Sequence, residues 1–227
     1  MPDTYTTRVS AQSHAVALTA DCAIFGYATD ALRVLLVRRA VAPFAGDWVL
    51  PGGAMQAGQT LEQTAVRLLE ELVNVARVPI HQVATYSEPG RHPVRRVVTT
   101  SYFALVSPQD HHPEARQYLA EVNWCRMDEL PRLGFDHRRL LDDAYAALKE
   151  ALNRQPLAFH LLPDSFTLRE VQEVYEAILG EALDRRNFRR KLLAYDFLIN
   201  TSRKKSGVKG GPDLYRIDEE KLIGHLQ

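Results

Sequence analysis

Residues 183–195, LDRRNFRRKLLAY, concentrate four arginines, an asparagine and a lysine in one short segment. Within it, Phe188, Leu192 and Tyr195 follow the i, i+4, i+7 spacing of a single helix face. The segment is therefore predicted to form a short helix that buries this apolar stripe and exposes its charges on the opposite side. A helix of this kind is suited to a groove of duplex DNA.

Charge is unevenly distributed along the chain. Lysine plus arginine and aspartate plus glutamate both number 28, so the net charge alone indicates no nucleic-acid partner. Between Arg185 and Lys209, however, nine basic residues accompany a single acid, Asp196. A local positive surface of this kind is expected to bind phosphate groups.

The segments on either side of residues 183–195 complete a larger unit. Before them, SFTLREVQEVYEAILG (165–180) predicts a helix that begins after Thr167, with Glu170 closing a capping box, and that stops at Gly180. After them come FLINTS (197–202), RKKSGVKGG (203–211) and DLYRID (213–218). The first and last of these are strand-like and the middle one is basic, which predicts a hairpin with a basic tip. Helix, turn, helix and hairpin together predict a winged helix-turn-helix.

The N-terminal part of the chain predicts an α/β (α+β) domain. Strands are predicted at residues 15–27, 32–40, 95–106 and 121–127. Leucines and alanines at helical spacing predict a helix over 60–73 and another that begins after Asp136 as its N-cap. The polar stretch from Asn153 to Pro156 is the predicted domain boundary. The expected domains are thus residues 1–153 and residues 154–227.

Composition bounds the possible classes. With 227 residues, 46% hydrophobic and 25% charged, the chain is typical of a globular protein of one or two domains. No apolar run is long enough to span a bilayer and MPDTYTTRVS (1–10) lacks signal-peptide features, so a cytoplasmic location without a membrane role is expected. Cys22 and Cys125 are too far apart for a zinc site and are predicted to be small buried apolar residues.

The stretch WVLPGGAMQAGQTLEQTAVRLLEELVNV (48–75) resembles the Nudix box, the loop and helix with which Nudix hydrolases hold metal ions against a diphosphate. The family pattern is a glycine, a glutamate six positions later, and then Arg-Glu-apolar-any-Glu-Glu-any-Gly-apolar. With Gly53 as the first glycine, Gln59 replaces the glutamate and Arg67 matches the arginine. The resemblance extends over about residues 15–150 and implies a Nudix-fold sandwich.

The match fails at the metal ligands. Leu68 and Leu72 replace the first and third metal-binding glutamates, Glu71 retains the second, and Asn74 replaces the glycine. The family's three carboxylates occupy positions i, i+3 and i+4, which share one helix face and gather oxygen ligands around Mg²⁺. Because the metal supplies charge stabilisation in diphosphate cleavage, this domain is predicted to be inactive. No catalytic residue, cofactor or metal is expected, with Glu71 the residual candidate ligand.

Two further segments, 86–106 and 130–144, are similar to a Nudix subgroup tied to ADP-ribose and NAD metabolism. In that subgroup a loop reads Arg-Asp-Pro-Arg, whereas this chain has RHPVR (91–95). Strand-terminal arginines offer forks to a diphosphate, glycines allow close backbone approach, and tryptophan stacks on rings. The predicted effector-binding residues are Arg38, Arg39, Trp48, Gly52, Gly53 and Arg91.

Residues 159–218 resemble the C-terminal domain of the Nudix-related transcriptional regulators, the NrtR family, and LDRRNFRRKLL (183–193) is the most specific part of the match. The resemblance implies a Nudix-like sensor followed by an operator-binding winged helix. It also implies a repressor linked to NAD or sugar metabolism, with ADP-ribose or a sugar metabolite as effector. Operators of such domains are commonly palindromic, so a homodimer with half-sites about 34 to 36 Å apart, or multiples of that, is expected.

The basic helix and hairpin supply the predicted DNA contacts. Near the helix start, Arg185, Arg186 and Asn187 are predicted to contact bases, because arginine pairs with guanine and asparagine with adenine in the major groove. The residues predicted to contact phosphates are Arg189, Arg190, Lys191, Lys204, Lys205 and Lys209. The alternative for this segment is a solvated basic helix without a nucleic-acid partner.

Two other functions remain open from the sequence. One is a Nudix pyrophosphohydrolase that acts on ADP-ribose-like substrates through unusual metal ligands among Glu62, Glu70, Glu71 and Glu88. The other is a DNA- or RNA-binding protein in which the Nudix-like half serves only for dimerisation. Mg²⁺-dependent turnover would favour the first, and operator binding that ignores every nucleotide or sugar would favour the second.

Overall fold

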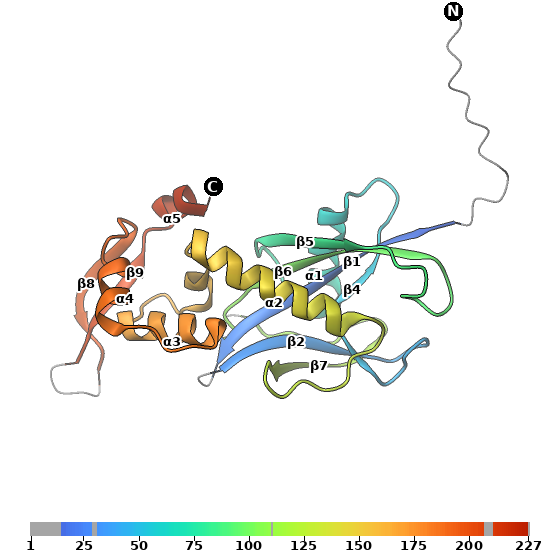
Figure 1. Cartoon of the computed structure of the whole chain (residues 1–227), viewed down its shortest axis with the longest axis horizontal. Coiled ribbons are helices and arrows are strands. Elements are labelled where there is room, and N and C mark those ends of the chain that lie inside the picture. Colours follow the sequence, from blue (N-terminus) through green and yellow to red (C-terminus); the bar gives the residue numbers. More distant parts are fainter. Residues whose placement is uncertain (1–14, 29–30, 110, 207–210, 227) are drawn as a thin grey trace, which may run out of the picture.

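The computed structural model describes residues 15–28, 31–109, 111–206 and 211–226. A mixed α/β domain is followed by a winged helix (Figure 1). The elements are β1 (Ala17–Ala28), β2 (Ala31–Arg39), β3 (Trp48–Val49), β4 (Gly52–Ala54), α1 (Leu61–Val73), β5 (Ile80–Tyr86), β6 (Val97–Leu105), β7 (Leu119–Arg126), α2 (His137–Arg154), the 3₁₀ helix η1 (Leu157–Leu161), α3 (Leu168–Leu179), α4 (Arg185–Leu192), β8 (Leu198–Lys204), β9 (Asp213–Ile217) and α5 (Glu219–Leu226).

A seven-stranded mixed sheet organises the N-terminal domain. Its order is β3-β2-β1-β6-β5, with β4 paired to β1 and β7 paired to β2. β1 and β6 run parallel, and β1 and β2 run antiparallel. β1, β2 and β6 are buried over most of their length. This pattern is expected for central strands that are covered on both faces.

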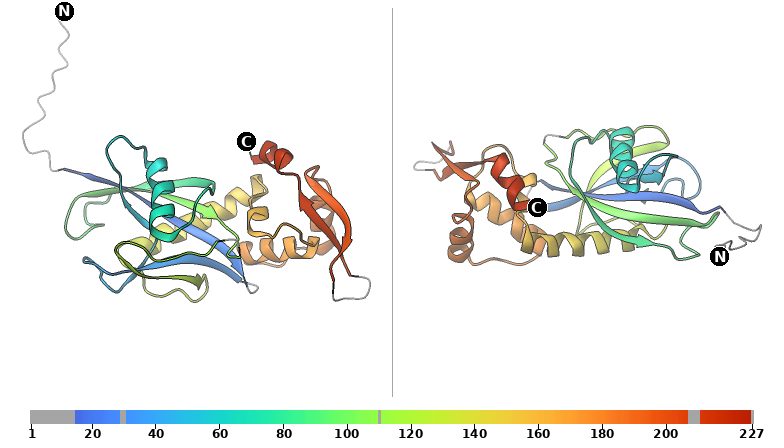
Figure 2. Two further views of the ribbon diagram at one scale, coloured as in Figure 1. Left: turned by 180° about the vertical axis from the view of Figure 1, so that it is seen from behind. Right: turned by 90° about the horizontal axis from the view of Figure 1, so that it is seen from above.

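Helices α1 and α2 cover opposite faces of this sheet (Figure 2, right). On the α1 side, Leu69 and Leu72 belong to a core that includes Ile24 of β1. On the α2 side, a second core begins at Phe25 and Phe103, includes the leucines of α2, and continues into α3 and α4. The winged helix therefore shares a hydrophobic core with one face of the sheet.

Local signals explain the ends of the winged-helix elements. Thr167 caps α3, and Glu170 completes a capping box as predicted, with the Glu170 carboxylate 2.7 Å from the Thr167 amide nitrogen. α3 ends at Gly180, whose φ of 77° is the left-handed conformation that glycine adopts easily. α4 follows a short turn, and β8 pairs with β9 in the predicted hairpin.

Several elements differ from the sequence prediction. α4 ends at Leu192, so Tyr195 lies beyond the helix and instead stacks on Phe197, with ring centroids 4.7 Å apart. Asp136 stands at the N-cap of α2, but its side chain makes no capping bond because it binds Arg91. Cys125 is only half-buried, whereas Cys22 is fully buried. The short strands β3 and β4, together with β5, η1 and α5, were outside the prediction.

Among the described residues, no helix combines the length and the apolar character needed to cross a bilayer.

Candidate functional site

A cavity of about 640 Å³ opens in the N-terminal domain. Residues of β1, β2 and β4, the loops that follow β2 and β5, and the start of α2 surround it. Its apolar lining includes Val37, Val49, Leu50, Leu72, Val97 and Leu119. A mostly apolar cavity of this volume, with a few polar groups, is typical of a small-molecule site.

Asp21 of β1 supplies a carboxylate to the cavity and is only 7% exposed. Its Oδ2 accepts a hydrogen bond from Thr99 Oγ1 at 2.6 Å. The Nε2 atom of His137 lies 3.8 Å from Oδ1, which exceeds hydrogen-bond distance. Within the part of the chain that the structure describes, no hydrogen bond reaches Oδ1.

His137, the first residue of α2, is neutral in this arrangement. Its Nδ1 accepts a hydrogen bond from the Leu50 amide at 2.9 Å, so the ring proton resides on Nε2, the nitrogen nearer Asp21. Burial lowers the pKa of His137, although the neighbouring carboxylates of Asp21 and Asp136 act in the opposite direction. The pair is therefore a carboxylate beside a neutral imidazole.

The position of Gly52 has no room for a side chain, because the Asp21 carboxylate lies against it. The two residues are opposite each other in the antiparallel pairing of β1 with β4, and a Cβ atom on Gly52 would lie 1.9 Å from Asp21 Oδ1. The missing side chain of Gly52 therefore makes room for a carboxylate, while close approach of a ligand to this glycine stays a prediction. At Gly53, a Cβ would meet Leu68 at 3.2 Å. Both glycines do line the cavity.

Three arginines line the same cavity. Arg91 donates two hydrogen bonds to Asp136, at 3.0 and 2.8 Å, and its side chain is 5% exposed. Arg39 donates to the Pro43 carbonyl at 2.8 Å. Arg95, which follows Arg91 in the same loop, is exposed. The cavity thus combines cationic groups with one buried carboxylate.

An aromatic surface accompanies the arginines. The Arg39 guanidinium carbon lies 5.3 Å from the centre of the Phe135 ring. Phe135 also stacks on His92 and His137, at centroid distances of 5.4 and 5.3 Å. Phe135 is therefore packed among two imidazole rings and a guanidinium group at the edge of the cavity.

Two residues predicted to bind the effector do not line the cavity. Arg38 binds the Gly46 carbonyl at 2.9 Å and lies 3.6 Å from Glu121. Trp48 packs against the core on the α2 side. Neighbouring residues of a strand point to opposite faces, so Arg38 faces away where Arg39 faces the cavity. Trp48 is the cross-strand partner of Arg38 and shares its face.

Asp21, His137, Phe135 and Tyr118 are cavity residues that sequence reasoning missed. Only Asp21 left a signal, as the single charged residue in the apolar run AVALTADCAIFGY (15–27). A charge in a central strand is rarely buried without a function or a partner.

Arg67 of the Nudix-like helix α1 binds three neighbouring polar groups. Arg67 donates to Glu71 at 2.7 Å, to Gln59 at 3.1 Å and to the Ala54 carbonyl at 3.2 Å. Glu71, the one retained carboxylate, is therefore occupied by an arginine of the same helix. Leu68 and Leu72 are 6% and 0% exposed and belong to the apolar core.

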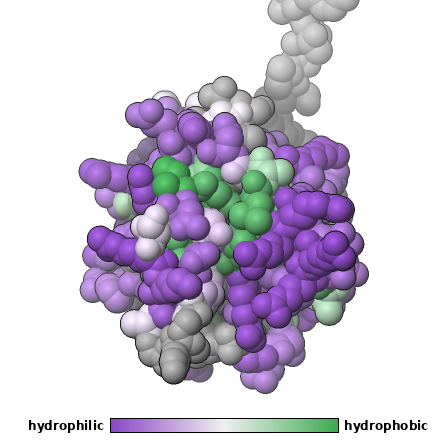
Figure 3. Space-filling model, turned by 90° about the vertical axis from the view of Figure 1, so that its left-hand side faces the viewer, coloured by the Kyte–Doolittle hydropathy of each residue, from purple (hydrophilic) through white to green (hydrophobic). Residues whose placement is uncertain are grey.

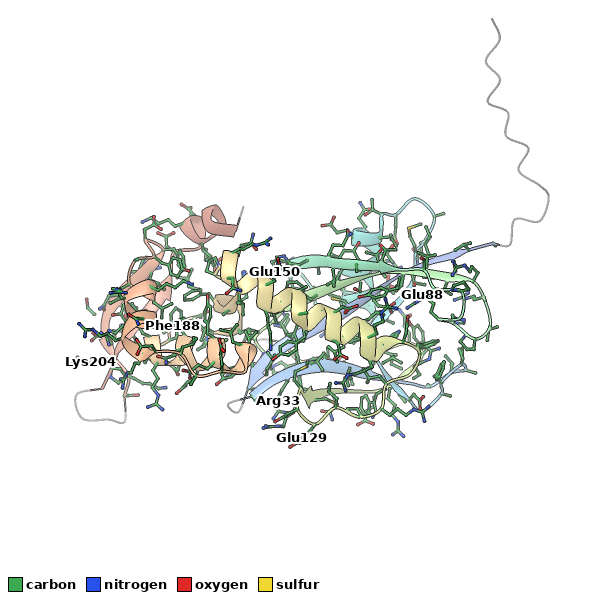
Figure 4. The ribbon with its side chains drawn as sticks, viewed as in Figure 1. Arg33, Glu88, Glu129, Glu150, Phe188 and Lys204 are labelled. Carbon is green, nitrogen blue, oxygen red and sulfur yellow. The ribbon has the colours of Figure 1, made fainter. Side chains whose placement is uncertain are left out.

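The other carboxylates considered as metal ligands do not converge. Glu62, Glu70 and Glu71 border a shallow surface beside α1. Glu88 instead lies near the start of α2, on the opposite side of the sheet, where it binds Arg139 at 2.7 Å (Figure 4). Among the described residues, no group of three or more His, Cys, Asp or Glu side chains is arranged to hold a metal ion.

The basic face of α4 is exposed. Asp184 caps the helix by accepting a hydrogen bond from the Asn187 amide at 2.8 Å. Phe188 points inward and meets Tyr175 edge-on at 5.0 Å, which fixes the opposite face outward (Figure 4). The exposed side chains are Arg185, Arg186, Asn187, Arg189, Arg190 and Lys191. Among them, Arg190 donates to the Asn187 side-chain oxygen at 3.2 Å.

Of the wing lysines predicted to contact phosphates, Lys204 lies beside α4, whereas Lys205 is paired with a residue of α3. Lys204, with Arg185 and Arg189, borders a groove of about 270 Å³ between α3, α4 and the hairpin. The Lys205 ammonium is instead 2.7 Å from a carboxylate oxygen of Glu170. Lys209 lies outside the described residues. This end of the molecule is mostly hydrophilic around a smaller apolar area (Figure 3).

Helix α2 connects the cavity to the winged helix. Its first residue, His137, lines the cavity, and Leu148 and Leu152 near its other end lie in the core shared with α3 and α4. Midway along, the Tyr145 hydroxyl donates to the Ile178 carbonyl of α3 at 2.7 Å. One rigid element therefore contacts both regions.

Comparison with known families finds one domain model in each half of the chain. The model of the NUDIX domain matches residues 17–144. The model of the NrtR DNA-binding winged helix domain matches residues 158–217. Both models match without overlap and in the order expected from the sequence.

Individual relatives extend over most of the chain. It is 32% identical over 203 residues to the ADPR responsive transcriptional repressor NtrR of Acinetobacter baylyi, covering 88% of this chain and 81% of that protein. Shewanella oneidensis NrtR in complex with a 27-mer DNA has a TM-score of 0.78 and 32% identity, covering 91% of this chain and 95% of that one. The NUDIX domain of the Shewanella protein in complex with ADP ribose has a TM-score of 0.54 and 33% identity, over 59% and 89%.

Proposed function

This chain belongs to the NrtR family, a Nudix domain followed by a DNA-binding winged helix, and we propose from that membership that it is a transcriptional repressor controlled by ADP-ribose. The observation that carries the proposal is the similarity to an ADPR responsive repressor over 88% of the chain, which spans both domains. The ADP ribose complex of a related Nudix domain supports the choice of effector.

In the proposed complex, α4 enters the major groove. Arg185, Arg186 and Asn187 contact base edges near the helix start, where side chains of a recognition helix usually reach bases. Asn187 exchanges its contact with Arg190 for a base. The phosphate contacts come from Arg189, Arg190, Lys191 and Lys204, with Lys209 as a further proposed contact.

The proposed effector site is the cavity of the Nudix domain. Arg39, Arg91 and Arg95 bind the diphosphate, because guanidinium groups match phosphate oxygens in charge and geometry. Gly53 allows the ligand near the backbone of β4. Arg38 and Trp48, which face away from the cavity, are excluded from this site.

We propose further that the Nudix domain is not a hydrolase. Its relationship to a transcriptional regulator indicates a non-enzymatic role. Leu68 and Leu72 offer no oxygen ligands, and Glu71 is held by Arg67. The competing function, a pyrophosphohydrolase, would be supported by Mg²⁺-dependent release of AMP from ADP-ribose that disappears in Glu71→Gln.

The proposed domains are residues 1–153 and 154–227, with α2 as the link between them. An anionic ligand competes with Asp136 for Arg91, and so acts on the start of α2. At the other end, α2 shares a core with α4. The repressor is proposed to act as a cytoplasmic homodimer in which the ligand favours one arrangement of the two winged helices.

A gel-shift assay tests the function. Full-length protein is mixed with the DNA upstream of its own and neighbouring genes, and ADP-ribose, NAD and phosphorylated pentoses are added in turn. We expect a shifted band that ADP-ribose alters and the other compounds leave unchanged. A shift that no compound affects would rule out a sensor of these ligands, and the absence of any shift would rule out an operator in this DNA.

A further inference from the structure

The proposed effector cavity is lined by side chains of both charges. Arg39, Arg91 and Arg95 contribute positive charge, whereas Asp21 places a carboxylate among buried side chains. Phosphates are attracted by the arginines and repelled by the carboxylate. A ligand that fills the cavity therefore carries an anionic group and, apart from it, a neutral group that donates hydrogen bonds.

One oxygen of the Asp21 carboxylate accepts a hydrogen bond, and no donor among the described residues reaches the other. Thr99 binds Oδ2 at 2.6 Å, while His137 Nε2 remains 3.8 Å from Oδ1. No donor among the described residues reaches Oδ1, and Asp21 lines the cavity, so Oδ1 can accept a hydrogen bond from a ligand that enters there. The carboxylate packs directly on Gly52, where a Cβ would lie 1.9 Å from Oδ1, so a side chain at this position would displace Asp21.

We infer that Asp21 recognises the terminal sugar of the effector: its Oδ1 accepts a hydrogen bond from a hydroxyl of the ribose that ADP-ribose has and ADP lacks. This rests on the proposed function and adds the residue that distinguishes the two ligands. The proposal places the adenine ring against the outside of the stacked pair of Phe135 and His92, both of which line the cavity with the arginines. The hydroxyl-bearing sugar then occupies the buried end with Asp21.

Calorimetric titration of the full-length protein with ADP-ribose and with ADP tests the inference. Asp21→Asn keeps the shape of the side chain and removes its charge. A hydrogen bond to a charged group is worth about tenfold to hundredfold in affinity, so Asp21→Asn should weaken ADP-ribose binding by that factor. Binding of ADP should change less than about twofold, because in the proposed placement its adenosine lies at Phe135 and His92 and its diphosphate at the arginines, away from Oδ1.

A structural role for Asp21 predicts a different result. If its loss only disturbed the cavity, both ligands would lose affinity equally, and that outcome overturns the inference, as does unchanged binding of ADP-ribose. Asp21→Ser repeats the comparison with a smaller neutral side chain, and thermal unfolding checks that the variants are folded. Glu121→Gln, an exposed carboxylate on β7 that does not line the cavity, is the matched control. Failure of the unaltered protein to bind ADP-ribose would instead refute the proposed effector itself.

Discussion

Two adjacent lysines of the wing are expected to behave differently on DNA. Lys204 is exposed and, together with Arg185 and Arg189, lines the groove between α3, α4 and the hairpin. Lys205 is held 2.7 Å from Glu170, with the two side chains 51% and 31% exposed. We therefore predict that Lys204→Ala removes a phosphate contact and that Lys205→Ala removes a contact within the protein.

The magnitude follows from counterion release. Each phosphate neutralised on duplex DNA contributes about −0.9 to the slope of log affinity against log salt. Lys204→Ala should flatten this slope by about 0.9, so the affinity advantage of the unaltered protein shrinks about 3.5-fold when salt rises from about 50 to about 200 mM. Lys205→Ala should leave the slope unchanged and cost about 0.2 to 1 kcal/mol of stability, the usual worth of an exposed ion pair.

Fluorescence anisotropy on operator and on unrelated duplex DNA measures these slopes across a salt series. Lys204→Ala should weaken binding to both sequences alike, because a phosphate contact does not read bases. Lys149→Ala is the control, since Lys149 lies on α2 above the Tyr145 ring. An unchanged slope in Lys204→Ala, or equal flattening in Lys205→Ala, would refute the assignment of the two lysines.

Three further predictions concern stability. Phe188→Ala should lose about 3 to 5 kcal/mol in urea unfolding, because Phe188 is 8% exposed and packs on Tyr175. Leu72→Glu should destabilise the protein by several kcal/mol with or without Mg²⁺, because it buries a carboxylate where exposure is 0%. Burial lowers the pKa of His137, so the unfolded chain binds a proton more readily than the folded one. The free energy of unfolding should therefore decrease by up to about 1.4 kcal/mol per pH unit as the pH drops below 6.5, the ordinary pKa of histidine. His137→Gln should reduce that slope.

Each of these has a clear contrary result. An unfolding midpoint for Phe188→Ala equal to that of the unaltered protein would mean that α4 is not anchored by this ring. Stabilisation of Leu72→Glu by Mg²⁺ would mean that a metal site can be rebuilt in α1. A slope between pH 7 and 5 that is the same with and without His137 would mean that its imidazole does not resist protonation in the folded state.

The winged helix was largely predictable because its signals are local. The Thr167 and Glu170 capping box, Gly180 and the spacing of Phe188 and Leu192 each act within a few residues. Tyr195 fitted the same spacing, but the helix ends before it, because helical periodicity does not show where a short helix stops. The ion pair of Lys205 with Glu170 could not be predicted from the sequence either, because the two residues are distant along the chain and only the fold brings them together.

The cavity was only partly predictable because its residues come from separate strands and loops. Thr99 and Asp21 meet through the parallel pairing of β6 with β1, and His137 joins them from α2. No sequence pattern encodes that pairing. The choice between Arg38 and Arg39 likewise depended on which face of β2 is turned to the cavity, and strand alternation alone leaves this undecided.

The shared core gives a physical reason why a ligand in the Nudix domain can influence DNA binding. A ligand shifts a conformational equilibrium only through a difference in its affinity for the two states. In the proposed mechanism that difference arises at Arg91, which is bound by Asp136 in this structure and is released when a phosphate takes its place. The start of α2 then loses a contact at one end, while its other end remains packed against the winged helix. If the packed helices move as rigid units, a small displacement at Asp136 would be carried to α3 and α4 and would change the spacing of the two recognition helices in the proposed homodimer.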